Sequence, residues 1–266
     1  MTGVVVGMAR QDSMRATMRW AAEEAALHGL PLRLVHAWPA PVDVTVELPA
    51  GCDPDIAGPV TVCATPGPVA AVLTAADPAL LVLRRGPQAQ RLSAVTRSCL
   101  RAASCPIAVV PAGPVPASSR IVVGFCGTEA SWKALAWAAE EARRRLVLLI
   151  VVDVQPPSFA TALGLRRDRH RSDQGQESVT ADRVCQRSGP LLASVNVERH
   201  ARRDGPLDGL LAEGAEADLI VVGRSTHAGS PPGLRHIGDK SLFAPSVLLA
   251  SNRPHPTGGL GSGAGG

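Results

Sequence analysis

Residues 4–25 read VVVGMARQDSMRATMRWAAEEA, and residues 121–142 read IVVGFCGTEASWKALAWAAEEA. Each stretch holds a short apolar run that ends in glycine, then a loop, then a helix-forming segment that closes with WAAEEA. Trp20 and Trp137 stand 137 − 20 = 117 residues apart, and the same offset relates every position of the two stretches. A shared register without a gap indicates a duplicated domain, and only two copies make it a tandem and not a solenoid.

Length and composition agree with two domains. The chain has 266 residues, 45% of them hydrophobic and 19% charged, which is enough apolar material for two cores of ordinary size. Its longest apolar runs, such as 146–152, are far shorter than the roughly 20 residues that cross a bilayer. The N-terminus has no basic region followed by a long apolar run, so we expect no signal peptide. These features predict a cytoplasmic protein that does not bind a membrane.

Cysteine spacing and charge exclude further classes. The six cysteines show neither the C-x-x-C pairs nor the histidine spacing of a zinc site, so no metal is expected from their pattern, and the thiols should be free. The net charge is +4, with the densest basic cluster at 166–171. Aromatic residues make up 3% of the chain and tyrosine is absent, so stacking platforms for single strands are missing. We expect a solvated loop at this cluster and no nucleic-acid partner.

Short apolar runs alternate with helical periodicity in both halves. The first half predicts strands at 4–6, 32–38, 60–63, 80–83 and 107–110, and helices at about 12–28, 68–76 and 92–102. The second half predicts strands at 121–123, 147–154, 195–200, 219–222 and 247–250, and helices at about 129–145 and after 206. Such alternation implies βαβ units with right-handed crossovers, and therefore two doubly wound α/β domains with parallel sheets.

The domain boundaries follow from composition. Residues 1–110 form the first domain, 111–119 (PAGPVPASS) a linker, 120–252 the second domain with a polar insertion, and 253–266 a Gly-rich tail that we expect to be disordered. The segment 239–244 leaves space for little more than one helical turn before Pro245. A helix that short is unstable without docking, so the last strand is expected to be shifted or loosely held.

Together these segments resemble the universal stress protein family in its tandem, actinobacterial form. The resemblance rests on the repeated V-V-G and W-A-A-E-E-A, LRLVHAW at 32–38, Gly-Pro at 67–68 and 205–206, ADLIVVGR at 217–224, and SCPIAVVP at 104–111. It implies a five-stranded parallel sheet in the order 3-2-1-4-5 in each half. In many family members an ATP site lies at the switch point between strands one and four, where open α/β sheets bind ligands.

The ATP-binding members have an Asp shortly after strand one and a loop after strand four written G-x2-G-x9-G-[S/T]. The Asp position is Ala9 in the first half and Cys126 in the second, and the first half has no such loop, because 84–88 read RRGPQ. The second half keeps loop remnants with a longer spacer that contains Pro231 and Pro232, which lack amide donors. The degenerate ATP site implied in this way comprises Gly124, Cys126, Val152, Gly223, Thr226, Gly238 and Asp239.

The resemblance predicts a non-enzymatic protein of the stress response that acts through an unknown protein partner, with weak or absent nucleotide binding. Its two domains are expected to pair within the chain through their fifth strands, as in the family, and a homodimer is left open. One alternative is a stress sensor that binds ATP in the second domain. Less favoured are a nucleotide hydrolase, for which no paired nucleophile and base is visible, and a thiol redox protein based on Cys126, which has no second cysteine beside it.

The repeated WAAEEA segment has a chemical and a structural interpretation. The Glu pairs 23–24 and 140–141 would suit acid–base chemistry if they converged, but adjacent helical positions point about 100° apart. We therefore expect these carboxylates to face solvent. Trp20 and Trp137 are expected to pack against the sheet or against the other domain.

Overall fold

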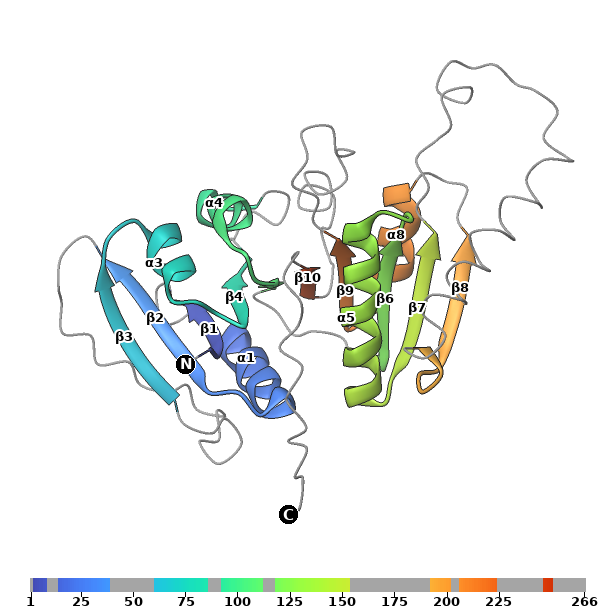
Figure 1. Ribbon diagram of the computed structural model, residues 1–266, viewed down its shortest axis with the longest axis horizontal. Coiled ribbons are helices and arrows are strands. Elements are labelled where there is room, and N and C mark those ends of the chain that lie inside the picture. Colours follow the sequence, from blue (N-terminus) through green and yellow to red (C-terminus); the bar gives the residue numbers. More distant parts are fainter. Residues whose placement is uncertain are drawn as a thin grey trace, which may run out of the picture.

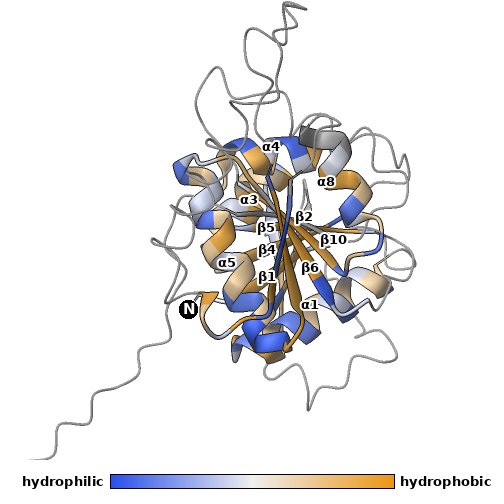
Figure 2. Cartoon of the chain, turned by 90° about the vertical axis from the view of Figure 1, so that its right-hand side faces the viewer, coloured by the Kyte–Doolittle hydropathy of each residue, from blue (hydrophilic) through white to orange (hydrophobic). Residues whose placement is uncertain are grey.

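The structure is a computed structural model that describes residues 2–8, 14–38, 60–85, 92–111, 118–153, 192–201, 206–223 and 246–250. Within these ranges helices cover both faces of a central sheet (Figures 1 and 2). The elements of the first half are β1 (Val4–Gly7), α1 (Arg15–His28), β2 (Leu32–Trp38), β3 (Val60–Pro66), α3 (Val69–Ala75), β4 (Leu80–Arg84), α4 (Ala94–Ala102) and β5 (Ile107–Val110). Those of the second half are β6 (Arg120–Phe125), α5 (Glu129–Arg145), β7 (Leu148–Asp153), β8 (Val197–Ala201), α8 (Pro206–Gly214), β9 (Leu219–Gly223) and β10 (Ser246–Ala250).

Each half forms the parallel sheet that its alternating pattern predicts. The strand order is β3-β2-β1-β4-β5 in the first half and β8-β7-β6-β9-β10 in the second, which is 3-2-1-4-5 in both. All pairs within a half are parallel, as crossover connections through helices require. The predicted α/β fold is confirmed.

The two sheets join into one. β10 pairs with β9 in parallel on one side and with β5 antiparallel on the other, where Leu248 lies opposite Ala108. The result is a continuous ten-stranded sheet in which the fifth strands of the two halves are neighbours (Figure 1). β10 is in register with both neighbours, so of the two expectations for the last strand the shift was wrong, because β5 supplies a second pairing partner.

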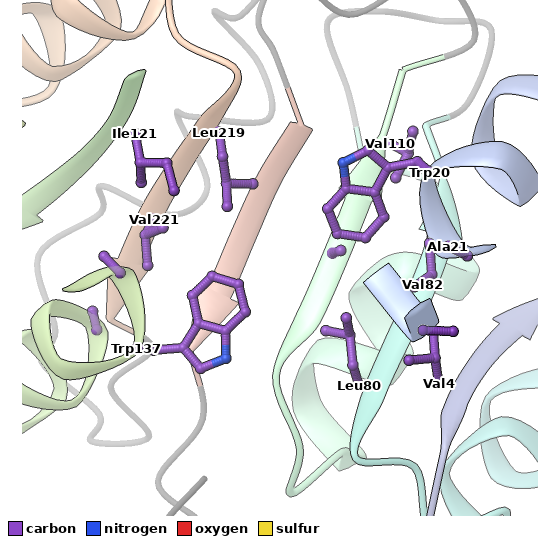
Figure 3. Close-up of a cluster of buried hydrophobic side chains, with 14 of the residues drawn as sticks. Val4, Trp20, Ala21, Leu80, Val82, Val110, Ile121, Trp137, Leu219 and Val221 are labelled. Carbon is purple, nitrogen blue, oxygen red and sulfur yellow. The ribbon is translucent and has the colours of Figure 1, made fainter. Parts of the chain in front are cut away.

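One face of this sheet carries a core that both halves share. α1 and α5 lie on that face, and their buried side chains form a single cluster with alternate residues of β1, β4, β6 and β9. Figure 3 shows Trp20 and Trp137 in this cluster, one from each half. The opposite face has separate clusters, one under α3 and α4 and one under α8. The halves are therefore joined both through the sheet and through the layer of α1 and α5.

The ends of α1 and α5 differ although their sequences are repeats. α1 ends at Gly29 in the left-handed conformation (φ 61°), and its amide binds the carbonyls of Ala25 and Ala26. The equivalent residue after α5 is Leu146, also left-handed (φ 56°) and 90% exposed. Glycine adopts this conformation without strain, whereas a leucine does not. The second copy thus retains the cap geometry without the residue that suits it.

In the part of the chain that the structure describes, no helix has both the length and the apolarity needed to cross a membrane.

Candidate functional site

The predicted nucleotide residues of the second half gather at the carboxyl edge of its sheet. Gly124 on β6 pairs with Val152 on β7 and with Val222 on β9, and Gly223 is the last residue of β9. The edge between β6 and β9 is the switch point of this half, because the chain continues to opposite sides of it. The structure therefore brings together Gly124, Val152 and Gly223, while Thr226, Gly238 and Asp239 lie outside the described residues.

Gly223 is held in close packing against the first turn of α5. A Cβ atom at this position would lie 2.4 Å from the carbonyl carbon and oxygen of Ala130 and 2.8 Å from the amide nitrogen of Ser131. These are backbone atoms, which cannot move aside as a flexible side chain would. Glycine is therefore required here for the approach of β9 to α5, whether or not a ligand binds.

Cys126 lies beside the N-terminus of α5, where the family's Asp would stand. It is partly exposed, and its Sγ is 3.3 Å from Oγ1 of Thr128. Thr128 is the N-cap of α5 and its Oγ1 accepts a hydrogen bond from the Ser131 amide. The thiol thus sits next to a capping hydroxyl, and this position carries no carboxylate that could bind a ribose or a cation.

At the same edge in the first half, an arginine replaces the glycine that ends the fourth strand. Arg84 is the last residue of β4, the place that Gly223 takes in β9. Arg85 follows and is buried, and burial lowers the pKa of its guanidinium from the ordinary value. Its amide donates to the Val110 carbonyl of β5. A side chain as large as arginine at the first loop position leaves no glycine cradle for phosphate at this edge.

A cavity of about 450 Å³ lies elsewhere in the first half, between β2, β3 and α3. Arg33, Cys63 and Thr65 supply its polar atoms, and Arg33 already donates to the Ala76 carbonyl. The remaining lining is largely apolar. Its lining includes no residue of β1 or β4, the strands that flank the first switch point, and it lacks the several converging polar groups that fix a ligand in a binding site.

The most unusual polar group in the structure lies at the seam between α1 and α5. Glu24 and Glu141, equivalent residues of the two WAAEEA segments, are each 1% exposed. The expectation that both Glu pairs face solvent was therefore wrong for these two members. Their neighbours Glu23 and Glu140 pair on the outside with arginines, Glu23 with Arg19 and Glu140 with Arg143. The helices meet across the seam, which buries one carboxylate of each pair.

Each buried carboxylate contacts a basic side chain of the other half. His28 Nε2 is 2.8 Å from Glu141 Oε1, and Arg145 Nη2 contacts Glu24 Oε1. Within each helix the same basic side chains face the nearer carboxylate, with His28 Nε2 3.5 Å from Glu24 Oε2 and Arg145 Nε 3.7 Å from Glu141 Oε2. His28 and Arg145 occupy equivalent positions of the duplication. We name Glu24, His28, Glu141 and Arg145 the seam cluster, in which each copy supplies the partner of the other copy's carboxylate.

Further contacts hold the seam cluster in place. The rings of His28 and Trp137 stack with centroids 6.5 Å apart, which confirms that Trp137 packs against the other half. Arg144 donates to the Leu27 carbonyl across the same seam at 3.4 Å. Burial lowers the pKa of Arg145, and the carboxylates of Asp218 and Glu23 oppose this effect. An arginine starts from so high a pKa that it stays charged here.

The helical spacing in the sequence indicates that Glu24 and Glu141 are buried. Trp20, Ala21, Glu24 and Ala25 recur at helical spacing, so Glu24 belongs to the buried stripe of α1, and the repeat offset transfers this to Glu141. The same offset relates His28 to Arg145. What the spacing could not show is that the two stripes face each other.

Several known proteins are similar to this chain in sequence. The profile of the universal stress protein family matches residues 118–234. A universal stress protein of Mycobacterium tuberculosis is 30% identical over 271 residues, covering 85% of this chain and 88% of the relative. One of Mycobacterium bovis is 29% identical with the same coverage. These relatives match both halves of the chain.

Solved structures show the same fold. The crystal structure of a universal stress protein from Archaeoglobus fulgidus superimposes with a TM-score of 0.66 at 12% identity, covering 94% of this chain and 96% of that one. A putative universal stress protein from Pseudomonas aeruginosa gives a TM-score of 0.58 at 14% identity, covering 94% and 93%. At such low identity the likeness concerns the arrangement of the chain and not its ligands.

Proposed function

The chain belongs to the universal stress protein family, and from this premise we propose that it acts in a stress response as a non-enzymatic binding protein that depends little or not at all on nucleotide. Its partner would be another protein. The proposed compartment is the cytoplasm, where the thiols of Cys63, Cys99, Cys105 and Cys126 would stay reduced.

The observation that carries the proposal is the chemistry of the two switch points. At the second, Cys126 stands beside the α5 N-cap in the position of the family's Asp. At the first, Arg84 replaces the leading loop glycine. Losing one charge-assisted hydrogen bond costs about 1.5 to 3 kcal/mol, which is roughly 10-fold to 150-fold in affinity. Neither edge therefore offers the full set of groups that tight ATP binding uses.

The joint sheet and the shared core support a role in partner binding. Because β5 pairs with β10 and because α1 and α5 share one core, the two halves present their outer surfaces in a fixed relation. A rigid two-domain body can engage a partner without the entropy cost of ordering its domains.

One observation favours the alternative, a sensor that binds ATP in the second domain. Gly124 and Gly223 remain on neighbouring strands at the switch point, next to the N-terminus of α5. A helix N-terminus attracts anions through its unpaired amides. This half therefore retains part of the electrostatic basis for phosphate binding.

Equilibrium binding of Mg²⁺–ATP to the full chain, together with phosphate release, separates these functions. The parent protein should bind more weakly than micromolar and release no phosphate above a buffer blank. Cys126→Asp should bind at least roughly 10-fold more tightly, because it restores a carboxylate, whereas Cys126→Ser should not. Micromolar binding by the parent would establish the sensor, and steady phosphate release would refute a non-enzymatic role. A larger residue at Gly223 is unsuitable for this test, because it would clash with the α5 backbone.

A further inference from the structure

We propose that Glu24, His28 and Glu141 of the seam cluster form a binding site for one divalent transition-metal ion of the Zn²⁺ type, bridging the two halves of the chain. Within the described residues this is the one group of three side chains of metal-ligand type whose ligand atoms all lie within 4.8 Å of one another. The proposal stands independently of the function proposed above, because it concerns α1 and α5 and not the switch points.

The distances among these three side chains suit the binding of one shared metal ion. His28 Nε2 is 2.8 Å from Glu141 Oε1 and 3.5 Å from Glu24 Oε2. When a metal binds nitrogen and oxygen tetrahedrally at about 2.0–2.2 Å, the ligand atoms lie about 3.3–3.6 Å from one another. Small side-chain adjustments would therefore place a cation among these three atoms.

The two carboxylates divide their oxygens between two sides. Glu24 Oε1 and Glu141 Oε2 face Arg145, whereas Glu24 Oε2 and Glu141 Oε1 face His28. Within the described part of the chain neither of the latter two oxygens receives a hydrogen bond, and the same holds for Glu141 Oε2 on the Arg145 side, although all three are fully buried. A cation on the His28 side would therefore leave Arg145 in place, where it would orient the metal-bound carboxylates as outer partners do in metal sites.

Charge points to a cation at this place. Two carboxylates and Arg145 leave one negative charge, in a group whose side chains are 1% (Glu24), 0% (Glu141) and 6% (His28) exposed. A buried charge without compensation is costly, so the oxygens on the His28 side need a positive partner. A divalent ion bound to the His28 imidazole and to these oxygens would supply that charge. Mixed imidazole and carboxylate ligands are those that Zn²⁺ and neighbouring ions accept.

Because the chain is duplicated, the second half shows which residue can replace His28 in a test of the site. His28 takes the place that Arg145 has in the second half, so His28→Arg makes the seam cluster symmetric while removing the only nitrogen ligand. An arginine at position 28 would present a positive charge to Glu141, as Arg145 does to Glu24, which favours folding of this variant. Glu23→Gln, on the exposed side of the same helix, is the control.

The experiment titrates the chelator-treated full chain with Co²⁺ and Zn²⁺. The expected result is saturable binding of one ion per chain, with visible Co²⁺ absorption and a raised thermal midpoint in Zn²⁺, in the parent and in Glu23→Gln but lost in His28→Arg. X-ray absorption of the parent's Zn²⁺ complex should show imidazole and carboxylate ligands at about 2.0–2.1 Å, which tests the site even if the variant does not fold. Absence of saturable binding would show that the seam cluster is an ion-pair network completed by a proton only. Equal binding by folded His28→Arg, or sulfur ligands in the X-ray absorption spectrum, would place the metal elsewhere and overturn the proposal.

Discussion

His28 Nε2 on α1 lies 2.8 Å from Glu141 Oε1 on α5, so a residue of the first copy of the repeat is the partner of a residue of the second. Arg145 and Glu24 make the reverse contact. The two copies of the repeated helix, α1 and α5, therefore contact each other, and they join the two halves through polar as well as apolar side chains.

Removal of one buried carboxylate should weaken the whole chain. Glu24→Ala leaves Arg145 without its partner across the seam, and we expect the free energy of unfolding in urea to fall by roughly 2 to 4 kcal/mol. The matched variant is Glu23→Ala, whose carboxylate pairs with Arg19 at the surface, and it should change stability by less than about 0.5 kcal/mol. Equal effects of the two substitutions would show that the seam cluster contributes no more than a surface pair.

The packing of Gly223 against α5 should make this position intolerant of a methyl group. Gly223→Ala places a Cβ 2.4 Å from the Ala130 backbone, and overpacking of this kind costs about 1 to 3 kcal/mol. Thermal unfolding without ligand measures the loss. A stable Gly223→Ala protein with an unchanged melting temperature would mean that the approach of β9 to α5 is looser than described.

The left-handed end of α5 should be improved by the residue that ends α1. Leu146→Gly removes both the strain of a left-handed leucine and an exposed apolar side chain, and should stabilise the protein by about 1 kcal/mol. The reverse change, Gly29→Ala, meets no atom within 4 Å, so its cost of about 1 kcal/mol would come from the backbone alone. Chemical denaturation of both variants provides the measurement. If Leu146→Gly destabilises the chain, the leucine must gain more from its contacts than its conformation costs.

Stability at low pH should depend in part on Glu140. A hydrogen bond from Arg143, with partial help from Arg144, holds the pKa of Glu140 below its ordinary value of 4.5. A lowered carboxyl pKa contributes stability that is present above the unfolded-state pKa and is lost as the pH falls through the folded-state pKa. Glu140→Gln should therefore be slightly less stable than the parent at pH 7, and the difference should vanish well below pH 4.5. Urea midpoints at several pH values would show this convergence, and a difference that grows toward acid pH would contradict it.

Much of the fold could be predicted from local patterns. The alternation of apolar runs with helical segments predicted the strands and helices, and the shared register of residues 4–25 and 121–142 predicted two copies of one fold. Such features are local, because a strand or a helical stripe repeats within a few residues. Of the candidate nucleotide residues, Gly124, Val152 and Gly223 lie together as the strand order requires.

Contacts between distant segments could not be predicted in the same way. The helical period shows on which side of α1 Glu24 lies, but not which residues contact it there. Arg145 and His28 lie on that side and reduce the free-energy cost of burying the carboxylate. The close approach of β9 to α5 likewise gives Gly223 a steric role that its place in a motif did not suggest. β10 is in register because β5 pairs with its free edge.

The sequence alone therefore determined the α/β fold, its duplication and the missing acidic residue at Cys126, since these depend on the order and type of residues along the chain. Only the tertiary structure decided how the two copies join and which of the repeated glutamates is buried. The physical reason is that burial of a charge depends on the partners that surround it in space, and in this chain those partners come from the other copy.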